Sequence, residues 1–441
     1  MKSSVSNSDP YDVAVIGGGP AGSTVATFLA QQGRRVALIE KEQHPRFHIG
    51  ESLLAKNLPI IDRLGLSREI SRIGVRKPGA EFVSPDHDER QAYFFCDALD
   101  PNPSYSFHVR RADFDEILFR HAASTGVAVW ENCLVTDNER VADGWRLSID
   151  GSDSSDGIFA KFLIDASGRD GFLARKHDLR SRDRKHNSAA LFAHYENVSP
   201  DAWRTKGNIA IYWFEHGWIW MIPLPDGVTS VGAVCMPDYL KTRTKDLDEF
   251  FEATLRLCPK AWDVIKDAAR TSAVTGAGNY SYRAKRAFGD GYLLVGDSYA
   301  FVDPVFSSGV LLAMSSAERA AQVVNVILDH PARATSLARR YQKDMDRAIY
   351  RFSWFQYRFN TPILQYLFMA PKKSLGVTQA VMSILAGDVY RGWSLGWRFG
   401  VFKMIYAVSR MRNREAAKAV AERLRGLPTI SMPENDSSEA T

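Results

Sequence analysis

Three glycines near the start of the chain have the spacing of a phosphate-binding turn. The segment GGGPAG supplies Gly17-x-Gly19-x-x-Gly22 between the apolar run YDVAVIG and the helix-forming run PAGSTVATFLAQQG. In such a turn Gly17 permits the tight bend, Gly19 lets a pyrophosphate approach the backbone, and Gly22 lets strand and helix pack closely. Pro20 and Ala21 open the predicted helix, whose N-terminus faces the phosphates. The pattern predicts dinucleotide binding.

Glu40 supports the same interpretation. It ends the second apolar run, RRVALIE, and a carboxylate about 20 residues after the glycines can hold a ribose hydroxyl. Lys41 follows directly and belongs to the same predicted cofactor site. An ordinary tight turn can carry the glycine motif alone, but strand, helix and terminal acid agree here.

Two further segments favour FAD over NAD. Asp297 follows the apolar strand in LLVGDSYAFVDP, where an acid can meet a ribityl chain or cap a helix. With the glycine motif, it resembles the second flavin motif of the glutathione-reductase-type FAD fold. Arg111 in RRADFDEIL is similar to an arginine near FAD in flavin monooxygenases, although Asp113 and Asp115 offer it a purely structural ion pair. Because no second GxGxxG announces an NAD(P)H domain, we expect reduced flavin from a separate flavin reductase.

Three motifs carry a more specific resemblance, to the flavin-dependent halogenases. Trp218-Ile-Trp220-Met-Ile222-Pro223 matches the family's WxWxIP, RKPGAEF matches its catalytic-lysine segment KxGxxF at Lys77, and Asp303-Pro-Val-Phe-Ser-Ser-Gly309 is similar to its halide motif beside the flavin. The resemblance covers most of residues 10–330 and, more loosely, the helical end. It implies that FADH2 and oxygen give a C4a-hydroperoxide, which oxidises chloride or bromide to hypohalous acid.

The resemblance also assigns roles to these segments. Lys77 would direct hypohalous acid to an aromatic carbon, since a desolvated lysine changes its pKa readily. Ser308 and Gly309, just before a predicted helix, would bind halide with their N–H groups, and Ser307 would be a further donor. Gly309 is also assigned to the flavin site. A simple N-cap is the alternative for this serine pair.

A second set of residues would surround the flavin. Gly50, Glu51 and Ser52 in GESLLA are similar to the family segment that passes over the ring, although they would also suit a loop and a helix cap. Alternate strand residues share a face, so Trp218 and Trp220 form one wall, with Ile219 and Met221 facing away. That wall is either core packing or a shield that keeps the substrate from the hydroperoxide. Pro304 and Phe306 are assigned to the same shielding group.

Two departures from related families narrow the predicted substrate and the predicted reaction. The tryptophan-accepting branch has a glutamate where this chain has Phe306, which favours the phenol- and pyrrole-accepting branch. The aromatic hydroxylases carry an Asp-Gly in their third motif, whereas this chain has Asp165-Ala166-Ser167-Gly168, which weakens the case for an NAD(P)H-dependent hydroxylase without excluding it. The substrate is therefore predicted to be an electron-rich aromatic small molecule, free or tethered to an acyl or peptidyl carrier protein.

Bulk composition sets outer limits. The chain has 441 residues and a net charge of +5, so nothing in it demands nucleic acid. Its four cysteines show no paired spacing, and we predict reduced thiols and no metal site. The N-terminus is not a signal peptide, and no apolar run reaches the roughly 20 residues that span a bilayer. We expect a cytoplasmic protein.

The predicted fold class is α/β: a glutathione-reductase-type FAD-binding fold with an inserted, mainly antiparallel β-sheet substrate domain and a helical C-terminal region. The predicted boundaries are a disordered tail at 1–10, the first part of the FAD-binding domain at 11–185 with substrate-domain strands around 77–110, the inserted sheet at 186–285, the return segment at 286–330, the helical region at 331–428 and a disordered tail at 429–441.

One open question concerns the C-terminal helices, and two alternative functions also remain. The basic, aromatic C-terminal helices favour packing over a core, but a weak membrane-surface contact or an acidic carrier protein would also suit them. The same fold also serves aromatic hydroxylases and geranylgeranyl-reductase-like oxidoreductases. A flavin-binding redox protein without turnover is the other alternative function.

Overall fold

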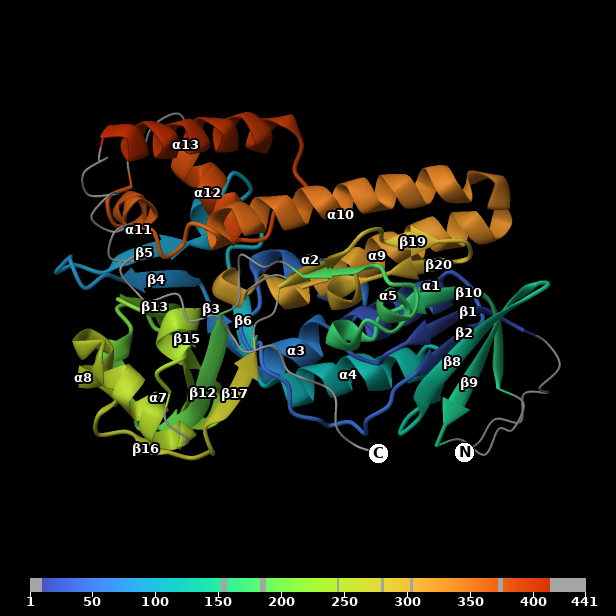
Figure 1. The fold of residues 1–441 in the computed structure, drawn as a ribbon, viewed down its shortest axis with the longest axis horizontal. Coiled ribbons are helices and arrows are strands. Elements are labelled where there is room, and N and C mark those ends of the chain that lie inside the picture. Colours follow the sequence, from blue (N-terminus) through green and yellow to red (C-terminus); the bar gives the residue numbers. More distant parts are fainter. Residues whose placement is uncertain are drawn as a thin grey trace, which may run out of the picture.

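The computed structural model describes residues 10–151, 157–182, 188–243, 246–278, 281–301, 304–371 and 376–412. The two predicted tails, apart from Pro10, and Asp303 of the predicted halide motif lie outside the described residues. Two eight-stranded sheets, two smaller sheets and the helices that surround them, including a C-terminal group, make up the described part of the chain (Figure 1).

The first sheet contains the predicted dinucleotide-binding strands. Its order is β19-β20-β10-β1-β2-β7, with β9 pairing both β10 and β8, and the neighbours from β20 to β7 run parallel. Its strands are β1 (Tyr11–Ile16), β2 (Val36–Ile39), β7 (Ala128–Trp130), β8 (Leu134–Val141), β9 (Gly144–Asp150), β10 (Ile158–Asp165), β19 (Phe288–Gly289) and β20 (Tyr292–Leu294). All four residues of β2 are buried, as parallel strands covered on both faces require.

Helices from distant parts of the sequence cover this sheet. α1 packs against both α4 and α9, so the helix after the glycine turn contacts the helix after the predicted halide motif. The α-helices of the chain from its start to the end of α9, including α7 and α8 on the second sheet, are α1 (Pro20–Gln31), α2 (Leu58–Arg63), α3 (Ser67–Ile73), α4 (Arg111–Ser124), α5 (Phe172–Lys176), α6 (Pro237–Leu240), α7 (Leu247–Arg256), α8 (Pro259–Ile265) and α9 (Ser308–Asp329).

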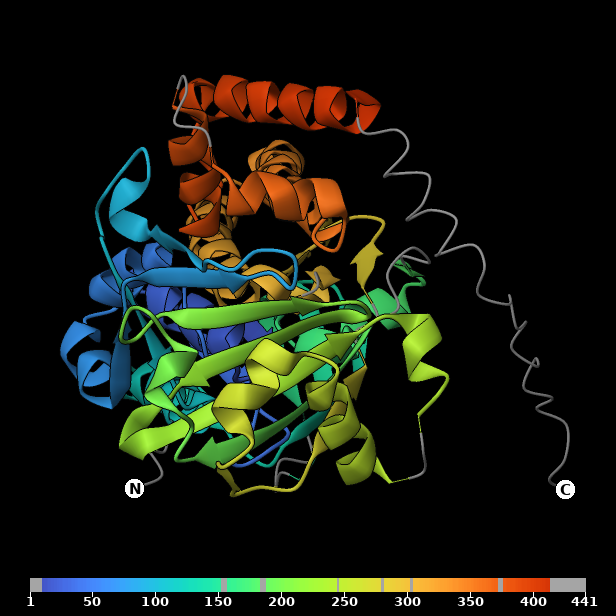
Figure 2. The same cartoon turned by 90° about the vertical axis from the view of Figure 1, so that its left-hand side faces the viewer.

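The second sheet is antiparallel except where β13 meets β4. Its order is β16-β12-β15-β14-β13-β4-β5, with β17 also pairing β12. Its strands are β4 (Gly79–Val83), β5 (Gln91–Phe94), β12 (Ala189–Glu196), β13 (Ile209–Phe214), β14 (Gly217–Pro223), β15 (Val228–Cys235), β16 (Ala269–Arg270) and β17 (Thr275–Gly278). α7 and α8 lie on its outer face (Figure 2).

Two small sheets complete the strand inventory of the described chain. One joins β3 (Gly74–Lys77) to β6 (Ser106–Val109), and the other joins β11 (Arg180–Arg182), β18 (Tyr282–Ala284) and β21 (Ala300–Phe301). The β3–β6 pair places Lys77 opposite Ser106.

Four helices follow α9 and lie along the top of Figure 1, the first of them over α9 and β19 and the other three over β4 and β5 of the second sheet. They are α10 (Ala334–Gln356), α11 (Pro362–Met369), α12 (Val377–Leu385) and α13 (Trp393–Arg412). α13 buries Phe399 and Phe402 but leaves Trp393 and Met411 exposed. The predicted packing of these helices over a core is therefore present along one face of α13.

Candidate functional site

The glycine turn between β1 and α1 has the geometry that its spacing predicts. Gly17 has a φ of +102°, and a Cβ atom there would lie 2.4 Å from the Ala166 carbonyl oxygen. A Cβ atom on Gly22 would lie 1.7 Å from the Gly17 carbonyl oxygen. α1 begins at Pro20 after Gly19, so its first N–H groups have no side-chain cap. The turn therefore tolerates no side chain at either end and presents backbone donors to an anion.

Glu40 fixes this turn through both of its carboxylate oxygens. Oε2 accepts a hydrogen bond of 2.6 Å from Gly18 N, and Oε1 accepts one of 2.9 Å from Glu42 N. The side chain is buried. Each oxygen keeps a second lone pair, so the predicted ribose contact remains chemically open while the carboxylate also shapes the loop.

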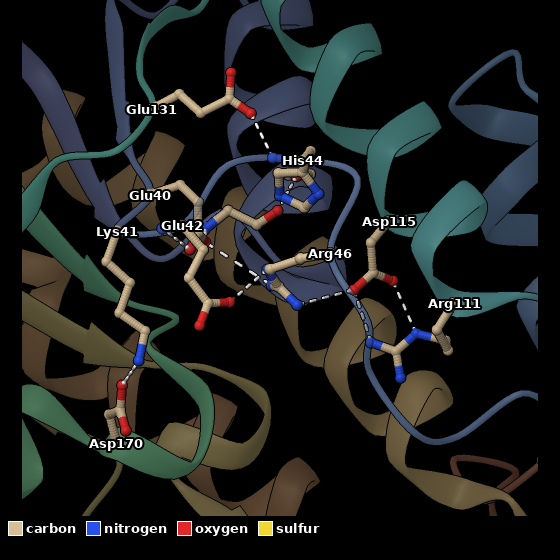
Figure 3. A network of polar contacts seen from close by, with 11 residues as sticks. Glu40, Lys41, Glu42, His44, Arg46, Arg111, Asp115, Glu131 and Asp170 are labelled. Carbon is tan, nitrogen blue, oxygen red and sulfur yellow. Dashed lines mark hydrogen bonds and ion pairs between the residues drawn. The ribbon is translucent and has the colours of Figure 1, made fainter. Parts of the chain in front are cut away.

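An arginine that sequence reasoning missed lies beside Glu40. Arg46 Nη2 is 3.9 Å from Glu40 Oε2, its Nε is 3.2 Å from Glu42, and its Nη1 is 3.6 Å from Asp115 Oδ2 (Figure 3). The guanidinium also lies over the turn, because a Cβ atom on Gly19 would be 3.4 Å from Nη2. The sequence offers one signal for Arg46, its closeness to Glu40 in the chain, and that closeness does not indicate where its side chain points.

Arg111 continues this row of charges. It binds Asp115 through Nε and Nη2 at 2.8 and 2.9 Å, so the structural ion pair considered from the sequence exists. Its Nη1 also donates to the Ile49 carbonyl oxygen at 2.9 Å, which ties it to the next segment of the site. Lys41 is not part of this row, since its Nζ pairs with Asp170 at 2.6 Å and both side chains are exposed.

The segment Gly50–Leu53 runs from Arg111 toward Lys77. Gly50 has a φ of +110°, and a Cβ atom there would lie 3.0 Å from Arg111 Nη1. Val109 N donates to Glu51 O, and Leu53 N donates to Phe107 O, so the segment is hydrogen-bonded along β6. The turn that follows it, Ala55–Asn57, contacts α9. The segment therefore contacts both Arg111 and Lys77, and the turn after it reaches the helix that follows the predicted halide motif.

Lys77 is buried at the end of β3, and its amine makes no ion pair in the described part of the chain. Its Nζ donates to Ser52 Oγ at 2.8 Å and to the Leu53 carbonyl oxygen at 3.0 Å, and it lies 5.3 Å from the Phe95 ring centroid. Burial lowers the pKa of Lys77 to about 7. The amine can thus exchange a proton near neutral pH.

Asp297 lies within the 3-10 turn Gly296–Ser298. Burial raises the pKa of its carboxyl to about 6, against the opposing charges of Arg169 and Arg111. Among the described residues its carboxylate has no hydrogen-bond partner, so it does not cap a helix. A carboxylate in this state suits a ligand hydroxyl.

The predicted halide residues open α9. Ser307 is the N-cap, with a φ of +55° and no side-chain cap hydrogen bond, while Ser308 and Gly309 form the first turn and do not precede the helix. Their N–H groups lack helical acceptors, and a Cβ atom on Gly309 would meet nothing within 4 Å. Pro304 and Phe306 belong to the preceding 3-10 turn. The arrangement can hold an anion.

Trp218 and Trp220 share one face of β14, as the strand period predicts. Their ring centroids are 5.8 Å apart, while Ile219 and Met221 pack on the opposite face with α7 and α8. Trp220 Nε1 donates to Ser230 Oγ at 3.2 Å. The wall is thus buried and oriented by a polar anchor.

Phe359 connects this wall to the loop before α9. Its ring centroid is 5.9 Å from that of Trp218 and 5.3 Å from that of Phe306. Phe306 also contacts Phe355 of α10 at 5.9 Å. The tryptophan wall and the predicted halide loop therefore belong to one aromatic cluster.

The donor set fits FAD. The glycine turn, the Arg46–Arg111 row and the Asp297 carboxylate offer groups for phosphates and hydroxyls, and one buried oxygen of Glu51 has no partner among the residues that the structure describes. Within the described residues no group of three His, Cys, Asp or Glu side chains could hold a metal ion. Over the same residues, no helix is both long and apolar enough to cross a bilayer.

Comparison with known proteins identifies the family. The Tryptophan halogenase family model matches residues 12–98 and 97–367. A tryptophan 2-halogenase of Chondromyces crocatus is 39% identical over 75% of this chain, which spans 64% of that protein. A 1H-pyrrole-2-carbonyl-[peptidyl-carrier protein] chlorinase of Pseudomonas fluorescens is 31% identical over 87% of this chain and 90% of its own length.

Solved structures agree with the sequence comparison. The flavin-dependent brominase Bmp2 superposes with a TM-score of 0.79 at 28% identity, covering 90% of this chain and 99% of the brominase. The predicted α/β class with an FAD-binding fold is confirmed. The chain belongs to the flavin-dependent halogenase family, an FAD-dependent class of enzymes.

Proposed function

We propose that this protein is a two-component halogenase that takes reduced FAD from a separate reductase and halogenates an electron-rich pyrrole- or phenol-type ring. The observation that carries the proposal is Lys77: a buried amine without an ion pair among the described residues, held by Ser52 and Leu53, with a pKa lowered to about 7. Such an amine can hold hypohalous acid by a hydrogen bond and direct it.

When bound, reduced FAD together with oxygen supplies the oxidising equivalent that converts halide to an electrophilic halogen species. The chain's own residues would bind the halide and keep the substrate away from the oxidant. The N–H groups of Ser308 and Gly309 at the α9 N-terminus would hold chloride or bromide, with Ser307 beside them. Trp218 and Trp220 would keep the aromatic substrate away from the oxidant.

The cofactor contacts are proposed for the remaining predicted residues. The turn containing Gly17, Gly19, Pro20, Ala21 and Gly22 would receive the pyrophosphate. The ribose, ribityl chain and ring would then meet the acids, Arg111 and the Gly50–Leu53 segment. Lys41 would contribute at the outer edge, where its exposed ion pair with Asp170 lies.

The relatives suggest two classes of ring. The chlorinase named for a pyrrole-2-carbonyl group on a peptidyl carrier protein aligns over nearly its full length, which supports a carrier-tethered pyrrole. The tryptophan 2-halogenase supports an indole as a second candidate. Phe306 favours the first, because its buried ring contacts Phe355 and Phe359 where the tryptophan-accepting branch has an acid.

A product assay tests the proposal. Purified protein would receive a flavin reductase, NADH, FAD, oxygen and chloride or bromide, with free phenols, free pyrroles, carrier-tethered pyrrole and tryptophan as substrates. We expect a halogenated pyrrole or phenol by mass spectrometry, and no such product without halide. An oxygenated product regardless of halide would instead support a hydroxylase, and tight flavin binding without any product would support a redox protein.

A further inference from the structure

Glu51 carries a buried carboxylate oxygen that no described residue satisfies. Its side chain is 3% exposed, and Oε1 lies 2.8 Å from His194 Nε2. Oε2 is buried without a hydrogen-bond partner. An unsatisfied buried acceptor costs free energy, more so when it is charged, and such groups in native proteins require an explanation. The oxygen therefore calls for a donor from a ligand.

His194 contacts the other oxygen from a paired strand of the second sheet. It lies on β12, on the same face as Phe192, whose ring is 6.2 Å from that of Trp220. Its backbone N donates to Ser272 Oγ at 2.9 Å, and its register partner on β15 is Ser230, so the strand position of His194 is fixed. The imidazole donates to Glu51 from the sheet face that carries the tryptophan wall.

The neighbours of Glu51 define the region that its free oxygen serves. Gly50, on one side, packs against Arg111, which pairs with Asp115 in the row of charges that begins at the glycine turn. Ser52, on the other side, accepts the hydrogen bond from Lys77. Glu51 therefore lies between the candidate phosphate-binding groups and the candidate catalytic amine.

We propose that His194 is a positioning residue for the flavin site. It engages Glu51 Oε1 so that Oε2 is presented, already oriented, as the acceptor for an N–H or O–H group of bound FAD. This role deepens the proposed function, since it rests on FAD occupying the site. It does not depend on which ring is halogenated, or on whether any ring is.

Binding of oxidised FAD to the purified protein, followed by flavin fluorescence, tests the assignment. Glu51→Gln keeps the shape and an oxygen for His194 but places an NH2 group where Oε2 accepted. We expect its Kd for FAD to rise by about 10- to 100-fold, the range for a hydrogen bond to a charged group. Wild-type affinity in this variant would overturn the proposal.

The two histidine variants separate positioning from general stability. His194→Ala should weaken FAD binding, whereas His194→Gln, whose amide can still donate to Glu51, should recover most of it. His216→Ala is the matched control, because His216 stacks on Tyr239 at the end of the same sheet. Equal losses in the alanine and glutamine variants would also overturn the proposal. If His194→Ala does not fold, the Glu51→Gln and His194→Gln results decide it.

Failure of the proposed function has a different signature. A protein that yields no halogenated product but shows this pattern of FAD affinities would retain the role of His194 and lose only the halogenase proposal. A protein that halogenates, yet whose Glu51→Gln, His194→Ala and His194→Gln variants bind FAD as well as wild type, would retain its function and lose this role.

Discussion

Replacing Lys77 with methionine should make the protein more stable and less active. Burial lowers the pKa of Lys77 from 10.5 to about 7, and each pKa unit corresponds to about 1.4 kcal/mol. At pH 7 the unfolded chain holds this proton fully and the folded chain about half of the time, so the buried amine costs about 4 kcal/mol. Methionine fills a similar volume without charge.

The loss of two hydrogen bonds opposes this gain. Without the amine, Ser52 Oγ and the Leu53 carbonyl oxygen lose their donor, at a cost of about 2 kcal/mol for the pair. The Lys77→Met variant should therefore be more stable than wild type by about 2 kcal/mol at pH 7. Halogenation should fall to background, while FAD binding is retained.

The pH dependence gives the sharper test. The folded pKa lies below the unfolded pKa, so wild-type stability should rise as pH increases from about 7 toward 10.5, because only the unfolded chain still binds the proton there. The variant lacks this rise, and its advantage should vanish at alkaline pH. Urea unfolding followed by tryptophan fluorescence at pH 7 and at about pH 9.5 measures the difference.

A matched lysine controls for the loss of a positive charge. Lys161 is half exposed and pairs with Asp12 on the first sheet, so Lys161→Met should change neither the product yield nor the pH dependence appreciably. A Lys77→Met variant that is less stable than wild type at pH 7, or whose stability difference from wild type is the same at both pH values, would contradict this prediction. Undiminished halogenation would remove Lys77 from its catalytic role.

Three further perturbations test other parts of the site. Changing Trp218 and Trp220 together to leucine should lower stability by about 3 kcal/mol or more and raise the ratio of oxygenated to halogenated product in mass spectra before FAD affinity falls; an unchanged ratio would contradict the shielding role. Gly22→Ala in α1 should abolish FAD binding in a fluorescence titration, because its Cβ atom would lie 1.7 Å from a carbonyl oxygen. Gly400→Ala in α13 has open space and should fold and bind FAD normally; equal behaviour of the two variants would refute this contrast. Because the carboxyl of Asp297 has a pKa of about 6, wild-type FAD affinity should strengthen as pH rises through 6 and the ionised acceptor forms, and Asp297→Asn should show a flat profile; a flat wild-type profile would exclude this contact.

Local patterns predicted the parts of the site that are set within a few residues. The glycine turn follows from the absence of room for a Cβ atom at Gly17 and Gly22, and the common face of Trp218 and Trp220 follows from the strand period. The placement of Glu40 at the end of β2 follows from the buried parallel strand before it. In each case, short-range geometry leaves little choice.

Contacts between distant segments could not be predicted in this way. Arg46 meets Asp115, and Glu51 meets His194, only because tertiary packing brings a loop to a helix in one case and to β12 in the other. Burial of Lys77 likewise depends on the Gly50–Leu53 segment crossing it, so the spacing of RKPGAEF gives no hint without the resemblance. The left-handed backbone at Ser307 is a further local feature, and it could not be predicted because serine seldom adopts a positive φ.

Phe359 bears on how enzymes of this architecture can diversify. It follows α10 in sequence, yet its ring contacts Trp218 from the sheet and Phe306 from the loop before α9. A recombination event after α9 would therefore bring in a new inner surface along with new helices. Hybrid proteins that exchange this C-terminal part should fold and function only when the donor supplies an aromatic ring of compatible size at the position of Phe359. An exchange at this boundary would therefore change the substrate range and the stability of the fold together.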